Sequence, residues 1–285
     1  MDVLAFAKIN LSLCVGPRSD DGYHPIDSLI QTIDLADRIT LEADPGGSVD
    51  SWNSLGIPSD RDLGAAAARA VLSEVGSSVG VRIHIDKRIP VGSGLGGGSS
   101  DAAAVLAATN SLLGQPLSPQ DLRRLGMSLG ADVPLFLVGG SLRMTGIGEI
   151  IQPVDSIREE SFVLVVPRVH CNTAAVYGRF DELHPHRQST TLGAMFELAR
   201  NDLECAALDL YPDLAPVAAA VRSMTSGGGA VFVGMSGSGS AYFAAFRSAE
   251  AAAEASKSLT ELLPEARIYL TNPTPTGHNF EGGQP

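Results

Sequence analysis

Residues 89–110, IPVGSGLGGGSSDAAAVLAATN, join a glycine-rich loop to the start of an alanine-rich segment. Glycine allows backbone N–H groups to approach an oxyanion closely and adopts positive φ without strain. Ser99, Ser100 and Asp101 are residue types favoured at helix N-caps, so the loop is predicted to lead into a helix N-terminus. Free N–H groups and the helix dipole favour negative charge there. The segment is therefore predicted to bind an anion, such as a polyphosphate.

Two other phosphate-binding patterns fit this loop less well. Gly92, Gly94 and Gly97 match G-x-G-x-x-G, but a dinucleotide site also needs a βαβ unit and an acidic residue about 20 positions later. The segment after the helix, LLGQPLSPQDL, does not resemble a strand, and Pro90 interrupts the preceding strand. The P-loop pattern also fails, because no lysine follows the glycines. A purely structural turn remains an alternative, although such a turn rarely needs so many glycines.

A second glycine-rich turn, GMSGSGS, covers residues 234–240 and lies between two apolar runs. Taken alone, it is equally compatible with an ordinary hairpin. Two such loops in one chain favour a phosphate-lined cleft between two halves of the protein. Peptide dipoles can bind phosphate without a basic patch, which suits a chain of formal net charge −12.

The N-terminal segment is predicted to form a strand with polar groups that project side by side. Residues 3–15 alternate with the period of two that is typical of a strand. The pattern predicts one apolar face, formed by Val3, Ala5, Ala7, Ile9, Leu11 and Leu13. Lys8, Asn10 and Ser12 share the other face, which Leu4 and Phe6 make partly apolar. This face is thus either a solvated sheet surface or part of a site.

Helix and strand signals are mixed throughout the chain without strict βαβ alternation, which favours the α+β class with two lobes. A capping box, with Ser118 as N-cap, Pro119 at the first position and Asp121 three residues after the cap, predicts a helix that stops near Gly130. Asp132 then lies just beyond that helix. The further elements expected are strands at 37–42, 81–89, 161–167 and 266–271, a strand pair around residues 234–240, and helices at 61–76, 99–113, 173–181, 190–200, after Pro212 and at 249–263. The tail 272–285 is rich in proline and glycine and is expected to be loosely ordered.

Composition excludes several classes of protein. The 285 residues suggest about two domains, and 44% hydrophobic residues are enough for a substantial core. No run of 18 apolar residues is present, and the N-terminus lacks the basic start of a signal peptide. The net charge of −12 argues against nucleic acid and anionic membrane as partners. Three scattered cysteines, Cys14, Cys171 and Cys205, argue against a disulfide framework and favour the cytoplasm.

The motifs together resemble the GHMP kinase superfamily. PVGSGLGGGSSDAA is similar to its signature loop, and GMSGSGS is similar to its C-terminal glycine motif. The segments AFAKINLSLCVGPRSDDGYHPIDSLIQTIDLAD, GADVPLFLVGG, GIGEIIQPV and NDLE resemble, more narrowly, the members that phosphorylate a cytidine diphosphate-linked methylerythritol. The resemblance implies a lobe like ribosomal protein S5 domain 2 over residues 1–152 and a ferredoxin-like lobe over residues 153–285. It also implies transfer of the γ-phosphoryl group of ATP to a hydroxyl of a small molecule in the isoprenoid pathway.

The resemblance also assigns roles to individual residues. Asp132 matches the catalytic base and Lys8 the catalytic lysine of the family. The positions that match the ATP-phosphate loop are Pro90, Val91, Gly92, Ser93, Gly94, Leu95, Gly96, Gly97, Gly98, Ser99 and Ser100. The positions that match the substrate pocket are Asn10, Tyr23, His24, Ile147, Thr173 and Tyr177, with the two tyrosines on either side of the cytosine. Magnesium is expected to accompany ATP; the superfamily often uses the last serine of the loop, here Ser100, as a ligand.

Two departures from the family pattern leave questions open. Asp62 occupies a position where the family usually has an asparagine that frames the nucleotide site. Residues 155–190 are the least family-like part of the chain, and they include Thr173 and Tyr177. The alternatives are another GHMP kinase, of the homoserine or mevalonate type, and a homologue that binds nucleotide without catalysis. Loss of the cytosine pocket would favour the first, whereas retention of both Lys8 and Asp132 argues against the second.

Overall fold

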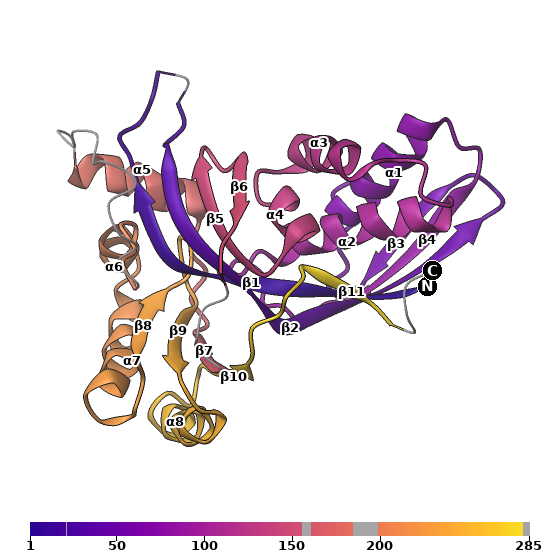
Figure 1. Cartoon of the computed structure of the whole chain (residues 1–285). Coiled ribbons are helices and arrows are strands. Elements are labelled where there is room, and N and C mark those ends of the chain that lie inside the picture. Colours follow the sequence, from indigo (N-terminus) through magenta and orange to yellow (C-terminus); the bar gives the residue numbers. More distant parts are fainter. Residues whose placement is uncertain (21, 156–160, 185–198, 282–285) are drawn as a thin grey trace.

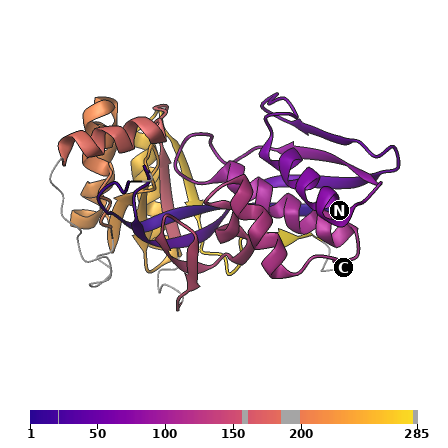
Figure 2. The ribbon, with the colours of Figure 1, turned by 90° about the horizontal axis from the view of Figure 1, so that it is seen from above.

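The computed structural model describes residues 1–20, 22–155, 161–184 and 199–281, and it folds into two lobes that lie side by side (Figure 1). Each lobe contains one sheet with helices packed against it, so the predicted two-lobed α+β class is confirmed. Figure 2 shows the two lobes from above, with the long strands of the first sheet passing from one lobe toward the other. Among the described residues, no helix is long and apolar enough to cross a membrane.

The first sheet is built around one long strand that pairs with different strands along its length. β2 (Ile26–Asp44) pairs with β1 (Asp2–Val15) along its length. Its first part also pairs with β5 (Ser141–Gly146), and its second part with β4 (Gly80–Asp86). The parallel strand β3 (Val49–Asn53) continues the sheet beyond β4, and the antiparallel β6 (Ile150–Pro153) continues it beyond β5. The sequence pattern gave no signal for β3, β5 and β6.

Two irregularities in the pairing of β1 with β2 change which side chains share a face. The register with β2 shifts between Phe6 and Ala7 and again between Asn10 and Ser12. At the first shift β2 has two extra residues, Asp34 and Leu35, and at the second β1 has one, Leu11. Such insertions interrupt the regular alternation of side chains between the two faces of the sheet. The expected single apolar face is therefore wrong: the side chains of Ala7, Ile9 and Leu11 belong to a different hydrophobic cluster from those of Val3, Ala5 and Leu13. Lys8 and its neighbour Asn10 stay adjacent as predicted, but both are buried.

Four helices cover one face of the first sheet (Figure 1). They are α1 (Leu63–Val75), α2 (Gly97–Leu112), α3 (Pro119–Leu129) and α4 (Val133–Val138). The predicted capping box at Ser118 and Asp121 is present, and α3 ends one residue before Gly130. The short α4 has no signal in the sequence, and Asp132 lies at its N-cap rather than in an open loop.

The second lobe has the ferredoxin-like arrangement. Its four antiparallel strands lie in the order β10 (Arg267–Thr271), β7 (Ser161–Val166), β9 (Tyr242–Phe246) and β8 (Phe232–Met235). In chain order this is 4-1-3-2, which is the order that a β-α-β-β-α-β unit produces. The predicted strand–turn–strand around residues 234–240 is the β8–β9 hairpin.

The helices of the second lobe agree in part with the sequence. α5 (Thr173–Leu183), α7 (Ala215–Gly227) and α8 (Ala249–Leu262) were expected. α6 (Glu204–Leu210) was not predicted, and the short 3-10 turn η1 (Pro212–Leu214) was not distinguished from the helix expected after Pro212. Most of the helix expected at 190–200 lies outside the described residues. Its last positions, 199 and 200, are not helical.

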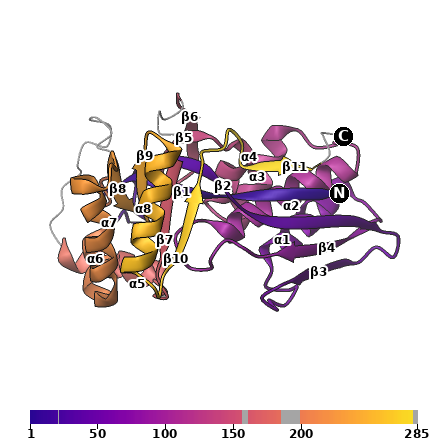
Figure 3. The ribbon, with the colours of Figure 1, turned by 90° about the horizontal axis from the view of Figure 1, so that it is seen from below.

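The C-terminal tail returns to the first lobe. Residues 278–280 form β11 (His278–Phe280), which pairs with β1 from Val3 to Ala5 (Figure 3). The expectation of a loosely ordered tail is therefore wrong for this segment. It is held by a ladder of backbone hydrogen bonds that a composition rich in proline and glycine does not reveal. The later segment of the proposed division, residues 153–285, thus contributes one strand, β11, to the sheet of the first lobe.

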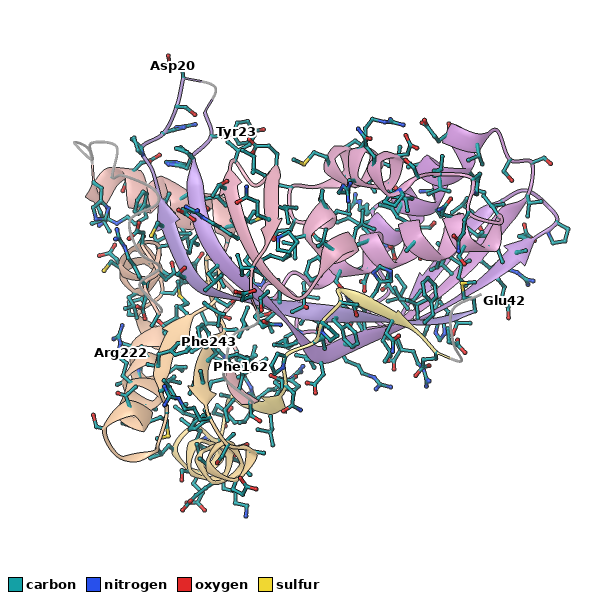
Figure 4. All side chains as sticks on the ribbon, in the orientation of Figure 1. Asp20, Tyr23, Glu42, Phe162, Arg222 and Phe243 are labelled. Carbon is teal, nitrogen blue, oxygen red and sulfur yellow. The ribbon has the colours of Figure 1, made fainter. Side chains whose placement is uncertain are left out.

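The two lobes share a hydrophobic cluster. Phe162 and Phe243, labelled in Figure 4, project from β7 and β9 and are fully buried. They pack with Ile9, Leu11 and Ile33 from the first sheet in the same cluster. Burial of side chains of this size stabilises a contact by roughly 1.5–3 kcal/mol each. The lobes therefore meet through a packed core, which fixes their positions relative to each other.

Candidate active site

A cavity of about 490 Å³ lies where the two lobes meet. Its wall combines Lys8 and Asn10 from β1 with Asp132, the glycine loop before α2, and Thr173 and Tyr177 from α5. Backbone of the second glycine turn, at Gly237 and Ser238, completes one side. The volume is within the range of ligand sites for small molecules.

The glycine loop has the conformation expected of an anion site. Gly92, Gly94 and Gly96 have φ of +67°, +79° and +76°, which only glycine adopts readily. α2 begins at Gly97, and its N-cap, Gly96, makes no side-chain capping bond. The first N–H groups of the helix are thus available to a ligand. Asp101 and its neighbours lie inside the first turns of α2, so their expected place at the N-cap is wrong.

Only part of the predicted loop faces the cavity. Its wall includes Pro90, Val91, Gly92, Gly94, Gly96, Gly97, Gly98 and Ser99. Ser93, Leu95 and Ser100 are buried and do not line it. Ser93 Oγ donates to Pro90 O and Ser100 Oγ donates to Phe6 O, so both hydroxyls shape the loop.

The second glycine turn, residues 234–240, forms hydrogen bonds with the glycine loop before α2. Ser236 Oγ donates to Gly94 O at 3.0 Å and accepts a hydrogen bond from Asn10 N at 3.2 Å. Ala241 N donates to Ser93 O at 3.0 Å. These bonds fix the loop against β1 from the side of the second lobe. The turn is thus more than a hairpin connection, because its serine hydroxyl forms a hydrogen bond with the glycine loop.

Lys8 and Asp132 meet at the centre of the cavity. Lys8 Nζ lies 3.9 Å from Asp132 Oδ2 and donates to Asn10 Oδ1 at 2.5 Å. Asn10 Nδ2 in turn donates to Ser28 Oγ, which orients the amide. Burial lowers the pKa of Lys8 below its usual value, and the Asp132 carboxylate partly opposes that effect. Asp132 is 36% exposed and so remains open to a ligand, whereas Lys8 is 6% exposed.

Two predicted substrate residues on α5 also face this centre. Thr173 Oγ1 lies 2.9 Å from Ser238 Oγ, so a hydrogen bond joins α5 to the second glycine turn. Tyr177 is half-buried, and burial together with the nearby Asp132 charge raises the pKa of its hydroxyl to about 12. Tyr177 therefore stays neutral at physiological pH and presents an aromatic ring to the cavity.

The remaining predicted substrate residues lie outside the cavity wall. Tyr23, labelled in Figure 4, lies in the loop between β1 and β2. Its side chain is 61% exposed, and Ile147, between β5 and β6, is 44% exposed. The side chain of His24 is 7% exposed, and its ring lies 5.2 Å from that of Tyr177. Its Nδ1 pairs with Gly16 O and its Nε2 faces Asp181, so both nitrogens already have partners.

The far end of the cavity, beyond the glycine loop, was not predicted from the sequence. That end is lined by Asn53, Ile57, Arg61, Leu63, Ile85 and Lys87. Asp62, noted as a departure from the family pattern, is there too. Its Oδ1 caps α1, and its Oδ2 accepts from Ser51 and Asn53. An aspartate directly before an alanine-rich helix is a recognisable N-cap signal.

Lys87 links the strand before the glycine loop to the helix after it. Its Nζ contacts Asp37 on β2 and Asp101 on α2, and all three side chains are almost fully buried. Burial lowers the pKa of Lys87, but the two carboxylates outweigh this and raise it above the usual value. The ammonium is therefore retained, and it ties the end of β4 to the first turns of α2. No sequence signal links these three residues, because the fold alone brings them together.

Comparison with known proteins assigns the chain to a family. The family profile described as "GHMP kinases N terminal domain" matches residues 62–140, and "GHMP kinases C terminal" matches residues 183–265. A 4-diphosphocytidyl-2-C-methyl-D-erythritol kinase of Desulfitobacterium hafniense is 37% identical over 88% of this chain and 89% of its own length. The chain belongs to the 4-diphosphocytidyl-2-C-methyl-D-erythritol kinase family of GHMP kinases. The kinase of that name from Syntrophotalea carbinolica, at 38% identity over 90% and 93%, is a further member.

Solved structures agree with the family membership. A crystal structure of 4-(cytidine 5'-diphospho)-2C-methyl-D-erythritol kinase superposes with a TM-score of 0.80 and 34% identity, over 96% of this chain and 99% of that one. Homoserine kinase from Cytophaga hutchinsonii has a TM-score of 0.77 at 18% identity, over 98% and 96% of the two chains. The second similarity shows that the fold is shared across GHMP kinases.

Proposed function

We propose that the chain is a cytoplasmic kinase that transfers the γ-phosphoryl group of ATP to the 2-hydroxyl of 4-diphosphocytidyl-2-C-methyl-D-erythritol. The observation that carries the proposal is the Lys8–Asp132 pair, which lies in one cavity with an open helix N-terminus. Relatives with that name and more than 35% identity support the choice of substrate. The net charge of −12 favours small-molecule partners over nucleic acid.

Asp132 is the proposed general base. Its carboxylate is the acid group beside Lys8 that a substrate can reach, and it can accept the proton of the attacking hydroxyl. Lys8 Nζ, held by Asn10, stabilises the negative charge that develops as this proton leaves. Phosphoryl transfer needs mainly positioning and charge stabilisation from the protein, so this small set of groups is sufficient.

The glycine loop is the proposed site of the ATP phosphates. Its free N–H groups and the positive end of α2 compensate phosphate charge without a cluster of basic side chains. Asp62, Asn53 and Lys87 then lie at the nucleoside end of the cavity. Both carboxylate oxygens of Asp62 accept hydrogen bonds from the protein. At the position where the family usually has an asparagine, this chain therefore has an aspartate that caps α1.

Magnesium fits this site as the partner of ATP rather than as a metal held by the protein. Among the described residues, no group of three or more His, Cys, Asp or Glu side chains could hold a metal ion. Ser100, the ligand suggested by the resemblance, is fully buried and donates its hydroxyl to Phe6 O. Mg²⁺ commonly keeps several waters and binds through substrate phosphates, and it would supply charge compensation there.

The cytosine of the substrate is proposed to stack on Tyr177, with Tyr23 on its other face. Tyr177 lines the cavity within reach of the Asp132 charge, whereas Tyr23 projects from the neighbouring loop. Stacking of a base on an aromatic ring contributes about 1–3 kcal/mol. Ile147 and Thr173 are proposed to border the same ligand, Ile147 from the β5–β6 turn and Thr173 from α5.

The proposal is tested by ADP formation with purified protein, magnesium ATP and a panel of acceptors. We expect turnover with 4-diphosphocytidyl-2-C-methyl-D-erythritol and none with homoserine, mevalonate or galactose. Turnover with one of the other acceptors would keep the kinase assignment and discard the cytosine pocket. Tight ATP binding without any turnover would instead favour a homologue that binds nucleotide without catalysis.

Gly94→Ala is expected to weaken ATP binding by at least about tenfold, because the loop must move to accept the side chain. A Cβ at Gly94 would lie 2.3 Å from Ser236 O, and φ of +79° is strained for alanine. Isothermal titration calorimetry with a non-hydrolysable ATP analogue measures the change. Gly114→Ala provides a control with a similar φ of +81° but no neighbour within 4 Å. Equal ATP affinity in Gly94→Ala and wild type would contradict the assignment of the loop.

A further inference from the structure

The two rings proposed to hold the cytosine come from separate elements. Tyr23 belongs to the loop between β1 and β2, and Tyr177 belongs to α5 of the second lobe. His24, next to Tyr23 in the chain, reaches across to α5. Its ring is tilted by 37° to that of Tyr177 at 5.2 Å, and it lies edge-on to Phe180 at 6.0 Å. This histidine is thus a direct contact between the two elements.

A carboxylate one helical turn from Tyr177 fixes that contact. Asp181 Oδ1 lies 3.3 Å from His24 Nε2, and Gly16 O lies 3.0 Å from His24 Nδ1. Gly16 N also donates to Pro25 O, so the two ends of the loop are joined at this point. Residues four apart on a helix share a face, which places Asp181 and Tyr177 on either side of one imidazole.

Both nitrogens of His24 face oxygen atoms that accept hydrogen bonds. A hydrogen bond to an ionised carboxylate is stronger than one between neutral groups. The ring orientation of His24 is therefore set by Asp181 from one side and by Gly16 from the other.

We propose that Asp181 is a positioning residue for the cytidine end of the substrate. Through His24 it holds the β1–β2 loop against α5, and so fixes the separation of Tyr23 and Tyr177. Asp181 does not line the cavity, so it acts through His24 rather than on the base itself. This inference rests on the proposed function, because it assumes that a base stacks between the two tyrosines.

Asp181→Asn is the decisive variant, because it keeps the shape and removes the charge. We expect KM for 4-diphosphocytidyl-2-C-methyl-D-erythritol to rise roughly tenfold. KM for ATP and kcat are expected to stay within about twofold, since the phosphate loop and Lys8 are untouched. Glu182→Gln is the matched control: it removes the charge of the next residue, whose carboxylate is 67% exposed and pairs with Arg179.

A double-mutant cycle with His24→Gln separates positioning from an independent effect. If Asp181 acts through His24, the double variant has the same KM as the more impaired single variant. Additive effects would overturn the inference, and so would an unchanged substrate KM or a parallel loss of kcat and ATP affinity in Asp181→Asn. Wild-type protein that fails to use the cytidine substrate would instead overturn the proposed function.

Discussion

Asp132→Asn is expected to lower kcat by about a thousandfold while KM for both substrates changes by no more than a few fold. The asparagine fills the same space at the N-cap of α4 and leaves the cavity wall intact. It cannot accept the proton of the attacking hydroxyl. The variant therefore removes an interaction that is made only in the transition state, which lowers kcat without affecting binding.

Steady-state ADP formation gives kcat, and calorimetry with the cytidine substrate gives its affinity. Asp213→Asn is a suitable control, because this carboxylate is exposed in the second lobe and does not line the cavity. Activity within a few fold of wild type in Asp132→Asn would exclude the proposed base. A large loss of substrate affinity with little change in kcat would assign Asp132 to binding rather than to proton transfer.

Sequence patterns predicted the elements whose stabilising contacts join residues that are close together in the chain. The capping box at Ser118 and Asp121 defined α3, because both partners lie within one helical turn. Alternation could not reveal the two register shifts between β1 and β2, since such a shift depends on how the two strands pair. Nor could it reveal β11, whose ladder to β1 joins opposite ends of the chain.

The same distinction applies to the site. The glycine loop could be proposed as an anion site from its composition, because glycine and a helix start are local properties. Lys8 and Asp132 became candidates for one site only through the family resemblance, and the fold brings their charges to 3.9 Å. The contact of Lys87 with Asp37 and Asp101 and that of His24 with Asp181 depend on tertiary structure alone. Those contacts were accordingly missed.

Lys8→Met is expected to lower kcat by about a hundredfold to a thousandfold, since it removes the positive charge next to the reacting hydroxyl. Methionine has a similar length and tolerates burial, and the cost of burying an ammonium is removed. The folded state should therefore persist, although Asn10 Oδ1 loses its partner. Thermal unfolding followed by circular dichroism checks the fold, and ADP formation gives kcat. Activity close to that of wild type would show that the Lys8 charge is not used.

The pH dependence provides a more specific test of Lys8. Burial lowers its pKa, so the ammonium loses its proton at a lower pH than an ordinary lysine does. If the charged form is the active one, kcat/KM of the wild type falls as pH rises through that lowered pKa, and Lys8→Met lacks this alkaline decline. The lysines of the chain are Lys8, Lys87 and Lys257, so carbon-13 labelling gives few signals to assign. Because Asp37 and Asp101 raise the pKa of Lys87, the Lys8 signal should titrate first and the Lys87 signal later. The reverse order would mean that the Asp132 charge outweighs burial at Lys8, and the alkaline decline would then need another origin.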